Sequence, residues 1–451
     1  MGPEPGYLAA DTRHRQIPRR KNRRGYCARV LAPLTVSGTI RVPGDKSISH
    51  RSLILSSLAD GESEIRGILD AEDIRSTATV LRELGVQIPP FAQVIRIKGL
   101  GLRGLRQPRS ALDCGNSGTT TRLMAGVVAA HPFSARFVGD ASLSRRPMKR
   151  IAEPLTYMGA QFECEHGDGL PMTVHGVDLR SVDWDTGGSS AQVKSAILLA
   201  GLASAVEVRV TEKSLSRDHT ERMLRAMGVD VENDGSQVCL RPTHRLHPFD
   251  IQVPADPSSA AFFVALASLA TSGELTLTDV CLNPTRTGFF QALRRMGAKV
   301  DETREMSSGG EDIGSVRVGR AQLRGTRVTA EQVPAIIDEL PLLACVAAGA
   351  GVELEIRGAA ELRVKESDRI SAVVQNLRAV GAEAEELPDG LRVSAGRRQL
   401  AGTIDPRGDH RIAMAFGILS AATGNRITVS DPRCVAVSYP GFWEDLRRVA
   451  A

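Results

Sequence analysis

The sequence predicts an α/β protein of two domains, each built from three copies of one structural unit. The chain has 451 residues, which is too long for a single ordinary core. A pattern of helix and strand returns about every seventy residues, the signature of an internal repeat. One helix in each copy is apolar on nearly every side, so we expect it to be buried inside its domain.

This buried type of helix occurs six times and runs each time into a β-like stretch. The copies begin at Ser47, Gly118, Ser189, Pro257, Asp338 and Asp409. Successive starts are 71, 71, 68, 81 and 71 residues apart. Ordinary alternation of helices and strands does not predict so regular a spacing, so we interpret the copies as one repeated unit.

A second, amphipathic type of helix follows in each unit, and we expect it at the surface. Five copies end in a Leu-x-x-x-Gly turn that leads into another strand, and GFWEDLRRVA is a shortened sixth. The glycines of these turns are Gly85, Gly159, Gly228, Gly297 and Gly381. A left-handed residue ends many helices, and glycine adopts that conformation without a Cβ penalty.

The six units divide as three and three, because six are too many for one ordinary core. We place one domain at residues 45–253 and the other at 31–44 plus 254–451, with a hinge near 44–45 and 253–255. The extended segment at residues 30–44 has no partner strand in its own half. We expect it to pair with the second half, which makes the first half an insertion between two crossings.

The net charge of +5 is concentrated at the start of the chain. Residues 1–30 hold eight Lys or Arg and two Asp or Glu, a charge of +6, so the rest sums to −1. We interpret residues 1–30 as a disordered basic arm, with nucleic-acid binding by this arm as the alternative. A nearly neutral body does not attract a polyanion as a whole, so we expect no nucleic-acid partner.

The cysteines and apolar runs exclude further classes of protein. Seven cysteines lie far apart without CxxC spacing, which predicts neither a disulfide framework nor a metal site, and indicates a reducing, cytoplasmic location. The longest apolar stretches, such as residues 342–352, fall short of the roughly 20 residues that span a bilayer. We therefore expect no membrane partner.

Cations stand at the beginnings of several buried helices, where the helix dipole disfavours them. Backbone N–H groups, hydroxyls and a Lys or Arg at one helix start together form an anion pocket. A capped helix with a surface cation is the alternative for any single case, but recurrence in separate repeats favours anion sites. The residues concerned are Lys46, Arg51, Arg122, Lys194, His410 and Arg411.

Acidic residues stand at the corresponding place in the second half. Asp338 and Glu339 begin one buried helix, and RVKESDR brings Lys365, Glu366 and Arg369 close together. A carboxylate among cations accepts a proton, whereas one that is desolvated or pressed against another carboxylate stays protonated. We predict that this half brings acids and bases to a multiply anionic ligand held by the first half.

The motifs in which these residues occur resemble those of the enolpyruvyl transferases, in particular the second sequence class of the branch that acts on shikimate 3-phosphate. The likeness runs from about Val36 to Trp443 through GDKSISHR, CGNSGTTTR, DASLSRRPM, SSAQVKSA, LRVKESDR and GDHRIAMAF. It implies a two-domain inside-out α/β barrel, each domain three βαβαββ units with buried parallel helices. It also implies transfer of the enolpyruvyl group of phosphoenolpyruvate to the 5-hydroxyl of shikimate 3-phosphate, without metal or cofactor.

Position by position, the resemblance implies two sets of binding residues. Those for shikimate 3-phosphate are Lys46, Ser47, Arg51, Ser189, Ser190, Gln192, Arg217 and Asp338. Those for phosphoenolpyruvate are Lys46, Asn116, Gly118, Thr119, Arg146, Gln192, Arg369 and Arg411, and Ser117 belongs to the same loop. Asp338 is implied as the base on the 5-hydroxyl. Glu366 and Lys46 are implied as the proton source or relay for the methylene carbon.

Three positions depart from other members of the family. Ala191 and Leu123 fit the second sequence class. Val437 stands where some members place a Lys toward phosphoenolpyruvate, which predicts weaker binding or replacement by a cation such as Arg433. Gly118 leaves room for the inhibitor glyphosate.

The nearest alternative is the enolpyruvyl transferase that acts on UDP-N-acetylglucosamine. That enzyme carries a Cys in a mobile loop, whereas the corresponding segment here, GDASLSRRPM, has none. We expect a monomer.

Overall fold

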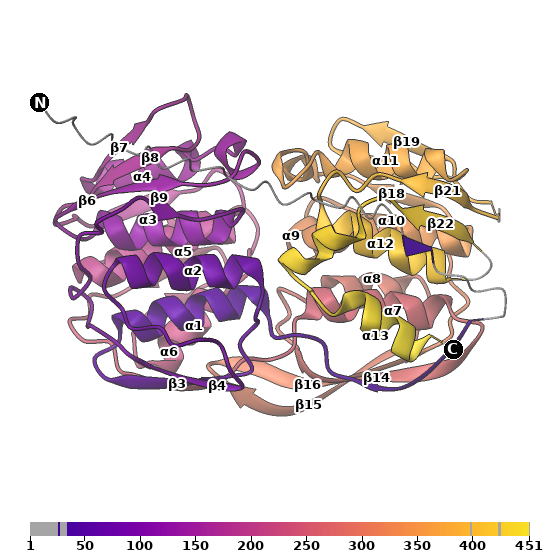
Figure 1. Ribbon diagram of the computed structural model, residues 1–451, viewed down its shortest axis with the longest axis horizontal. Coiled ribbons are helices and arrows are strands. Elements are labelled where there is room, and N and C mark those ends of the chain that lie inside the picture. Colours follow the sequence, from indigo (N-terminus) through magenta and orange to yellow (C-terminus); the bar gives the residue numbers. More distant parts are fainter. Residues whose placement is uncertain (1–25, 28–33, 397–398, 423–424, 451) are drawn as a thin grey trace, which may run out of the picture.

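The computed structural model describes residues 26–27, 34–396, 399–422 and 425–450. Its buried helices are α1 (Lys46–Leu58), α3 (Gly118–Ala129), α5 (Ala191–Ser204), α7 (Pro257–Leu269), α10 (Leu340–Ala350) and α12 (His410–Ala421). They lie side by side inside the two halves of the molecule, three in each (Figure 1). All six predicted buried helices are confirmed.

The amphipathic helices follow as the repeat predicts. They are α2 (Glu72–Glu83), α4 (Lys149–Met158), α6 (His219–Ala226), α8 (Gly288–Arg295), α11 (Arg369–Ala379) and α13 (Phe442–Val449). The five predicted turn glycines all have positive φ, from 82° at Gly228 to 123° at Gly159. Their left-handed conformation is confirmed.

Short helical segments connect these elements near the cavity described below. They are η1 (Leu143–Arg145), α9 (Val333–Ile336), η2 (Ile337–Glu339), η3 (Ala360–Val364) and η4 (Pro432–Val437).

Three small sheets cover the first half. Their hydrogen-bonded orders are β13-β3-β4, β5-β6-β8-β7 and β11-β12-β10-β9. The strands are β3 (Glu62–Arg66), β4 (Val94–Lys98), β5 (Leu112–Asp113), β6 (Ser134–Val138), β7 (Gln161–Cys164), β8 (Met172–His175), β9 (Val182–Asp185), β10 (Val208–Thr211), β11 (Val231–Asn233), β12 (Gln237–Leu240) and β13 (Asp250–Gln252). The helices lie inside these sheets, as the inside-out arrangement requires.

The second half repeats this arrangement within the described residues. Its sheets have the orders β15-β16-β14-β2, β17-β18-β20-β19 and β1-β22-β21. The strands are β1 (Tyr26–Cys27), β2 (Thr35–Ile40), β14 (Ser272–Cys281), β15 (Val300–Ser308), β16 (Glu311–Gly319), β17 (Thr326–Val328), β18 (Leu354–Ile356), β19 (Ala384–Leu387), β20 (Gly390–Val393), β21 (Ala401–Ile404) and β22 (Arg426–Val429).

The two halves exchange one strand each. β2, which precedes α1 in the chain, pairs in parallel with β14 of the second half, as predicted. In return β13, which precedes α7, pairs in parallel with β3 of the first half. The chain therefore crosses twice between the halves, and the crossings touch where the Asp45 amide donates to the Pro254 carbonyl at 2.7 Å.

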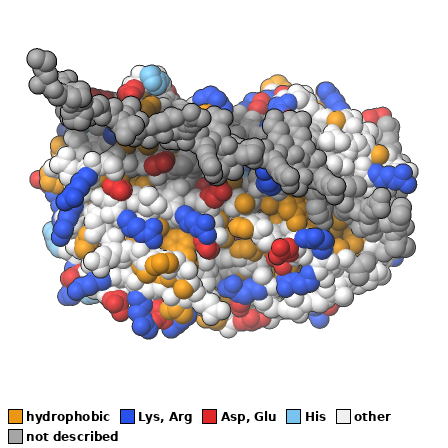
Figure 2. Space-filling model, in the orientation of Figure 1, with side chains coloured by type: hydrophobic (Ala, Val, Ile, Leu, Met, Phe, Trp, Pro, Cys, Tyr) orange, Lys and Arg blue, Asp and Glu red, His pale blue; other side chains and the backbone are white. Residues whose placement is uncertain are grey.

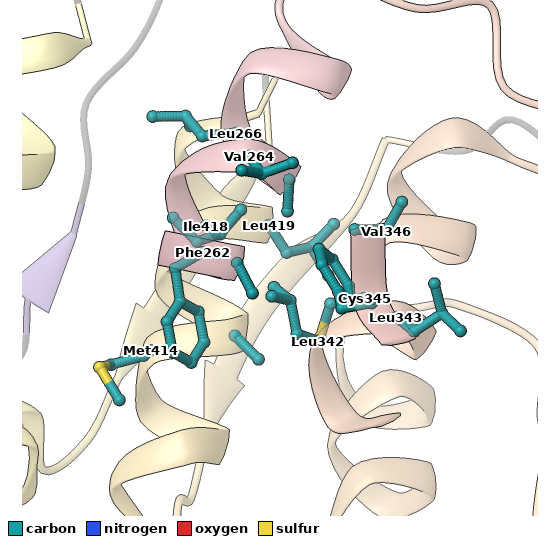
Figure 3. Packing of buried hydrophobic residues seen from close by; sticks show 14 of the residues in the cluster. Phe262, Val264, Leu266, Leu342, Leu343, Cys345, Val346, Met414, Ile418 and Leu419 are labelled. Atoms are coloured by element: carbon teal, nitrogen blue, oxygen red, sulfur yellow. The ribbon is translucent and has the colours of Figure 1, made fainter. Parts of the chain in front are cut away.

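The buried apolar residues form two clusters. One extends from Ile48 to Val253 and includes Cys281, and the other combines Leu34–Val42 with residues between Ala255 and Val449. In the second, Phe262 of α7, Leu342 of α10 and Met414 of α12 come from the three neighbouring helices (Figure 3). Gly126 allows α3 to approach α5, since a Cβ there would lie 2.3 Å from the Ala196 carbonyl oxygen.

The predicted basic arm falls mostly outside the described residues. Within it, Tyr26 and Cys27 pair with Val429 and Thr428 of β22, so these two residues belong to a sheet and not to a disordered arm. On the face shown in Figure 2, basic and acidic side chains are interspersed and form no single patch.

One helical stretch of the described residues, Val333–Ala350, is long and apolar enough to cross a membrane. Of this stretch, 67% is buried inside the protein, where α10 packs between α7 and α12. It is a core helix of the second half.

Candidate active site

A cavity of about 410 Å³ lies between the two halves, at the beginnings of the buried helices. The predicted site residues that line it are Lys46, Ser47, Arg51, Asn116, Gly118, Thr119, Arg146, Ser189, Ser190, Gln192, Arg217, Asp338, Glu366 and Arg411. The predicted residues outside this lining are Ser117, Lys194, Glu339, Arg369 and His410. The topology thus brings together residues that the sequence separates by more than 350 positions.

Arg51 is held in the cavity wall by three hydrogen bonds from its guanidinium group. Nε donates to Thr220 Oγ1 and Nη2 to Ser195 Oγ, both at 2.7 Å, and Nη1 donates to the Ser47 carbonyl at 3.0 Å. Burial lowers the pKa of Arg51 to about 10, so the group stays charged at neutral pH. These contacts fix a permanent positive charge in the first half.

Ser189 and Ser190 stand at the start of α5. The Ser190 side chain caps the helix by accepting from the Val193 amide. The Ser189 hydroxyl donates to the Ser214 carbonyl at 2.6 Å and accepts from the Ser214 amide at 3.1 Å. The helix start is therefore tied to the segment that leads to Arg217.

Gln192 lies between a cation and a hydroxyl group. Arg122 Nη1 donates to Gln192 Oε1 at 2.8 Å, and Gln192 Nε2 donates to Thr119 Oγ1 at 3.0 Å. Burial, assisted by the nearby Arg146, lowers the pKa of Arg122 to about 10. Arg122, predicted as an anion-pocket cation, lines the cavity.

Asn116 orients Arg146 in the loop before α3. Its Nδ2 donates to Asp140 at 2.6 Å, and its Oδ1 accepts from Arg146 Nη2 at 2.7 Å. Gly118 lies against the same cations, since a Cβ there would be 2.8 Å from Arg122 Nη1 and 3.4 Å from Arg146 Nη1. The glycine leaves these two guanidinium groups facing open space.

Lys46 is held by acids from both halves. Its Nζ lies 2.9 Å from Asp73 Oδ2, and its backbone amide donates to Asp256 Oδ2 at 3.1 Å. Burial opposes ionisation of Asp73, but Lys46 and its other cationic neighbours outweigh burial and lower the pKa of this carboxyl. Lys46 therefore faces the cavity as a cation paired to a carboxylate.

Asp338 is surrounded by cations. It accepts from Arg217 at 2.5 Å and lies 3.3 Å from Arg369 and 3.5 Å from Arg411. Burial opposes its ionisation, but Arg411, Arg217, Lys365 and Arg369 prevail and hold the pKa of Asp338 well below its ordinary value. Asp338 is therefore ionised, and an ionised carboxyl group has a free site for a proton.

Arg369 joins the two predicted catalytic acids from behind the cavity wall. Its Nη2 donates to Glu366 at 2.6 Å, its Nη1 to Asp338 at 3.3 Å and its Nε to Asp409 at 2.8 Å. Glu366 also lies 3.9 Å from Arg146 of the first half. Burial opposes ionisation of Glu366, but Arg369 and Arg146 keep its pKa well below the ordinary value.

The pKa of Glu339 is raised, whereas the pKa values of Asp338 and Glu366 are lowered. Burial, and the adjacent Asp338 carboxylate, raise its pKa although Arg411 opposes this. Glu339 accepts from the Ser258 hydroxyl and lies 3.4 Å from Arg411. It lies behind the cavity lining and anchors Arg411.

Lys194 does not form the anion pocket that the sequence predicts. Its side chain is fully buried, and its Nζ lies 2.8 Å from both Glu212 and Glu221. The reason is helical geometry: Lys194 is on the inward face of α5, whereas Ser190 and Gln192 face the cavity. Its partners follow 18 and 27 positions later, and the residues around them do not indicate a pairing with Lys194.

Several lining residues were not predicted as site residues. They are Asp73, Lys213, Ser214, Ser216, Asp256, Arg286 and Glu361, together with apolar residues of the second half such as Val333 and Pro334. One signal was available: Asp256 precedes α7 as Asp45 precedes α1, and both are N-caps at a chain crossing. Arg286 bridges these two caps, at 2.6 Å from Asp45 and 2.9 Å from Asp256.

The lining carries an excess of positive charge. Among the described residues it contains nine Lys or Arg and five Asp or Glu. This excess of four charges suits a ligand set with several anionic groups. The described residues contain no group of His, Cys, Asp and Glu that could hold a metal ion.

The predicted replacement of the missing Lys by Arg433 is not supported by its position. Arg433 has 92% of its side chain exposed and lies 3.7 Å from Asp431, and neither it nor Val437 lines the cavity. Arg122, Arg146 and Arg411, by contrast, do line the cavity.

A cleft of this charge between two barrels of buried helices defines an enolpyruvyl-transferase fold. The enolpyruvyl transferase NikO from Streptomyces tendae has the same fold, with a TM-score of 0.71 at 19% identity over 93% of this chain and 98% of that one. EPSP synthase from Acinetobacter baumannii is more similar, with a TM-score of 0.82 at 41% identity over 93% and 96%.

The sequence comparisons are more specific. The family model described as EPSP synthase (3-phosphoshikimate 1-carboxyvinyltransferase) matches residues 31–446, so the chain belongs to this family. A 3-phosphoshikimate 1-carboxyvinyltransferase from Sulfurihydrogenibium sp. is 47% identical over 92% of this chain and 97% of its own. The protein of that name from Xanthomonas euvesicatoria pv. vesicatoria is 47% identical over 90% and 93%.

Proposed function

We propose that the protein transfers the enolpyruvyl group of phosphoenolpyruvate to the 5-hydroxyl of shikimate 3-phosphate and releases phosphate. The observation that carries the proposal is the cavity lining, in which fixed cations from both halves surround two carboxylates, Asp338 and Glu366. The two substrates bring two carboxylates and two phosphate groups, which an excess of four positive lining charges stabilises. Family membership supports the same reaction.

Shikimate 3-phosphate binds to the first half, through Lys46, Ser47, Arg51, Ser189, Ser190, Gln192 and Arg217. Its binding draws Arg217 away from Asp338, which loses its shortest ion pair and becomes a stronger base. Phosphoenolpyruvate binds between the halves, with Lys46, Asn116, Gly118, Thr119, Arg146, Gln192 and Arg411. A contact of phosphoenolpyruvate with Arg369 stays a prediction, because this guanidinium is engaged by three carboxylates.

The reaction proceeds by addition and elimination. A proton reaches the methylene carbon of phosphoenolpyruvate from Glu366 or Lys46, and the adjacent carbon becomes electrophilic. The 5-hydroxyl adds to that carbon while Asp338 takes its proton. The tetrahedral adduct then releases phosphate, and the methyl carbon returns its proton to give the enolpyruvyl product. Fixed cations stabilise the departing phosphate in a site closed to water.

Glu366 is ionised on its own, but it can still act as the proton donor, because substrate binding changes the charges around it. Its pKa is low because Arg369, Arg146 and Lys46 outweigh burial. The phosphate and carboxylate of phosphoenolpyruvate offset these positive charges when they bind, and the pKa of Glu366 rises toward neutrality. The group then takes up a proton together with the substrate.

The two halves form the hinged unit of this mechanism. Residues 45–253 and 31–44 plus 254–451 move about the double crossing, and the contacts of Arg217 with Asp338 and of Arg146 with Glu366 join them across the cavity. Six described cysteines have free thiols, which supports a reducing, cytoplasmic location, and we propose a monomer.

The test is release of phosphate from phosphoenolpyruvate with either of two acceptors. Shikimate 3-phosphate is the expected acceptor. Phosphate release with UDP-N-acetylglucosamine alone would contradict the proposal.

A further inference from the structure

A buried ionic cluster lies directly behind the shikimate 3-phosphate side of the cavity. Lys194 Nζ is 2.8 Å from Glu212 Oε2 and 2.8 Å from Glu221 Oε1, and all three side chains are almost completely shielded from water. Burial would lower the pKa of Lys194, but Glu221 and Glu212 outweigh it and the net shift is upward. The ammonium group is therefore permanently charged.

Glu212 differs from Glu221 in what else it contacts. Its Oε1 accepts from the Ser190 backbone amide at 3.0 Å, at the start of α5. Its Oε2 accepts from the Ser216 hydroxyl at 2.8 Å and from the Ser216 amide at 3.4 Å, next to Arg217. One carboxylate thus holds two separate segments that carry predicted ligands of shikimate 3-phosphate.

The charge of Lys194 is what keeps this carboxylate in place. A buried carboxylate without a counter-charge would take up a proton or turn toward water. A protonated carboxyl or an amide has a donor at one of its ends, and that end would face either the Ser190 amide or the Lys194 ammonium group and the Ser216 amide, all of which are donors themselves. The negative charge of Glu212 is required for all of its contacts at once.

We infer that Lys194 and Glu212 are positioning residues, which fix Ser190 and Arg217 for shikimate 3-phosphate without touching it. The inference rests on the proposed function and assigns a role to a lysine whose side chain is 0% exposed and therefore meets no substrate. Most of the predicted ligands of phosphoenolpyruvate, such as Asn116, Arg146 and Arg411, lie on other elements, and Gln192 is the one on α5. A substitution in the cluster should therefore weaken the binding of shikimate 3-phosphate and not that of phosphoenolpyruvate.

Glu221 offers a matched control. Its carboxylate makes an ion pair with Lys194 of the same length and the same burial, but no hydrogen bond joins it to Ser190 or Ser216. Glu212→Gln and Glu221→Gln each remove one buried charge from the same ammonium group. If the cluster only stabilised the fold, neither variant should change the Kd of shikimate 3-phosphate.

The experiment measures the Kd of shikimate 3-phosphate by calorimetry without phosphoenolpyruvate, and then steady-state rates. Glu212→Gln should raise this Kd about tenfold, while kcat and the KM of phosphoenolpyruvate stay within twofold of the original protein. Glu221→Gln should leave the Kd within twofold. Equal effects of the two variants, or an unchanged Kd in Glu212→Gln, would overturn the inference.

Ser216→Ala keeps the test decisive if Glu212→Gln does not fold. It removes only the hydroxyl that donates to Glu212 and should raise the Kd about threefold. An unchanged Kd in this variant contradicts the inference. Where both variants fold, their effects should be less than additive, because they act through one hydrogen bond. An original protein that does not bind shikimate 3-phosphate would instead refute the proposed function.

Discussion

Arg217 of the first half donates to the Asp338 carboxylate of the second half at 2.5 Å, across the cavity. Both side chains are at least four-fifths buried. The pair joins a predicted ligand of shikimate 3-phosphate to the predicted general base. A substrate phosphate or carboxylate that takes over Arg217 therefore changes the basicity of Asp338 at the moment of binding.

Asp338→Asn should lower kcat by roughly 10²–10⁴-fold, the usual contribution of a general base. The amide keeps the size of the side chain and its acceptor oxygen, but it cannot take the proton of the 5-hydroxyl. The KM of shikimate 3-phosphate should change much less. Asp301→Asn, at a carboxylate of β15 that is 41% exposed, is the control and should keep its kcat. Turnover near that of the original protein in Asp338→Asn would refute the role as base.

Glu366→Gln should lower kcat by a similar factor, because the amide cannot carry a proton to the methylene carbon. A single-turnover experiment in deuterated water separates this role from binding. The original protein should exchange deuterium into the methylene group of phosphoenolpyruvate during turnover, and Glu366→Gln should lose that exchange. Exchange at the original rate would assign the proton to another group, such as Lys46.

The repeated units could be predicted from the sequence because each is a local pattern. The apolar helix that begins near Gly118 and the turn at Gly159 need only neighbouring residues to be recognised. The pairing of β2 with the second half could be expected, because residues 30–44 have no partner strand nearby. The pairing of β13 with β3 of the first half could not. Strands that pair with partners far away in the sequence carry no local pattern that indicates the partner.

The cavity residues divide in the same way. Those in motifs at helix starts, such as Arg51 and Arg411, could be predicted because helix dipoles make cations there unusual. Arg369 and Lys194 could not be placed, since a cation beside a helix start points either into the cavity or into the interior. The choice depends on acids that lie far from the cation in the sequence, Glu212 for Lys194 and Asp409 for Arg369.

Gly118→Ala should raise the KM of phosphoenolpyruvate about tenfold with kcat largely kept. The added methyl group would lie 2.8 Å from Arg122 Nη1 and 3.4 Å from Arg146 Nη1. Arg122 cannot move freely, because Gln192 and the Pro147 carbonyl hold its guanidinium. Steady-state kinetics with each substrate varied in turn test this. Glyphosate should inhibit the original protein below millimolar concentration and the variant less strongly.

The KM of shikimate 3-phosphate is the internal control for Gly118→Ala. Its predicted ligands Arg51 and Ser190 lie on other helices and should not respond. An equal rise in both KM values would show that the substitution disturbs the whole cleft and not the two guanidinium groups.

Acid should destabilise the protein well above the pKa of its carboxylates, because two histidines are buried without charge. Burial lowers the pKa of His50 to about 3 and that of His410 to about 4, from 6.5 in the unfolded chain. The unfolded state therefore binds more protons below pH 6.5, and stability is lost as the pH falls from there toward the folded values. At pH 5 each histidine should cost about 2 kcal/mol relative to pH 7.5. Urea unfolding at the two pH values measures this loss. His410→Gln should remove about 2 kcal/mol of it, whereas replacement of the exposed His166 should leave it unchanged. A loss that stays the same in His410→Gln would show that this histidine is not neutral in the folded protein.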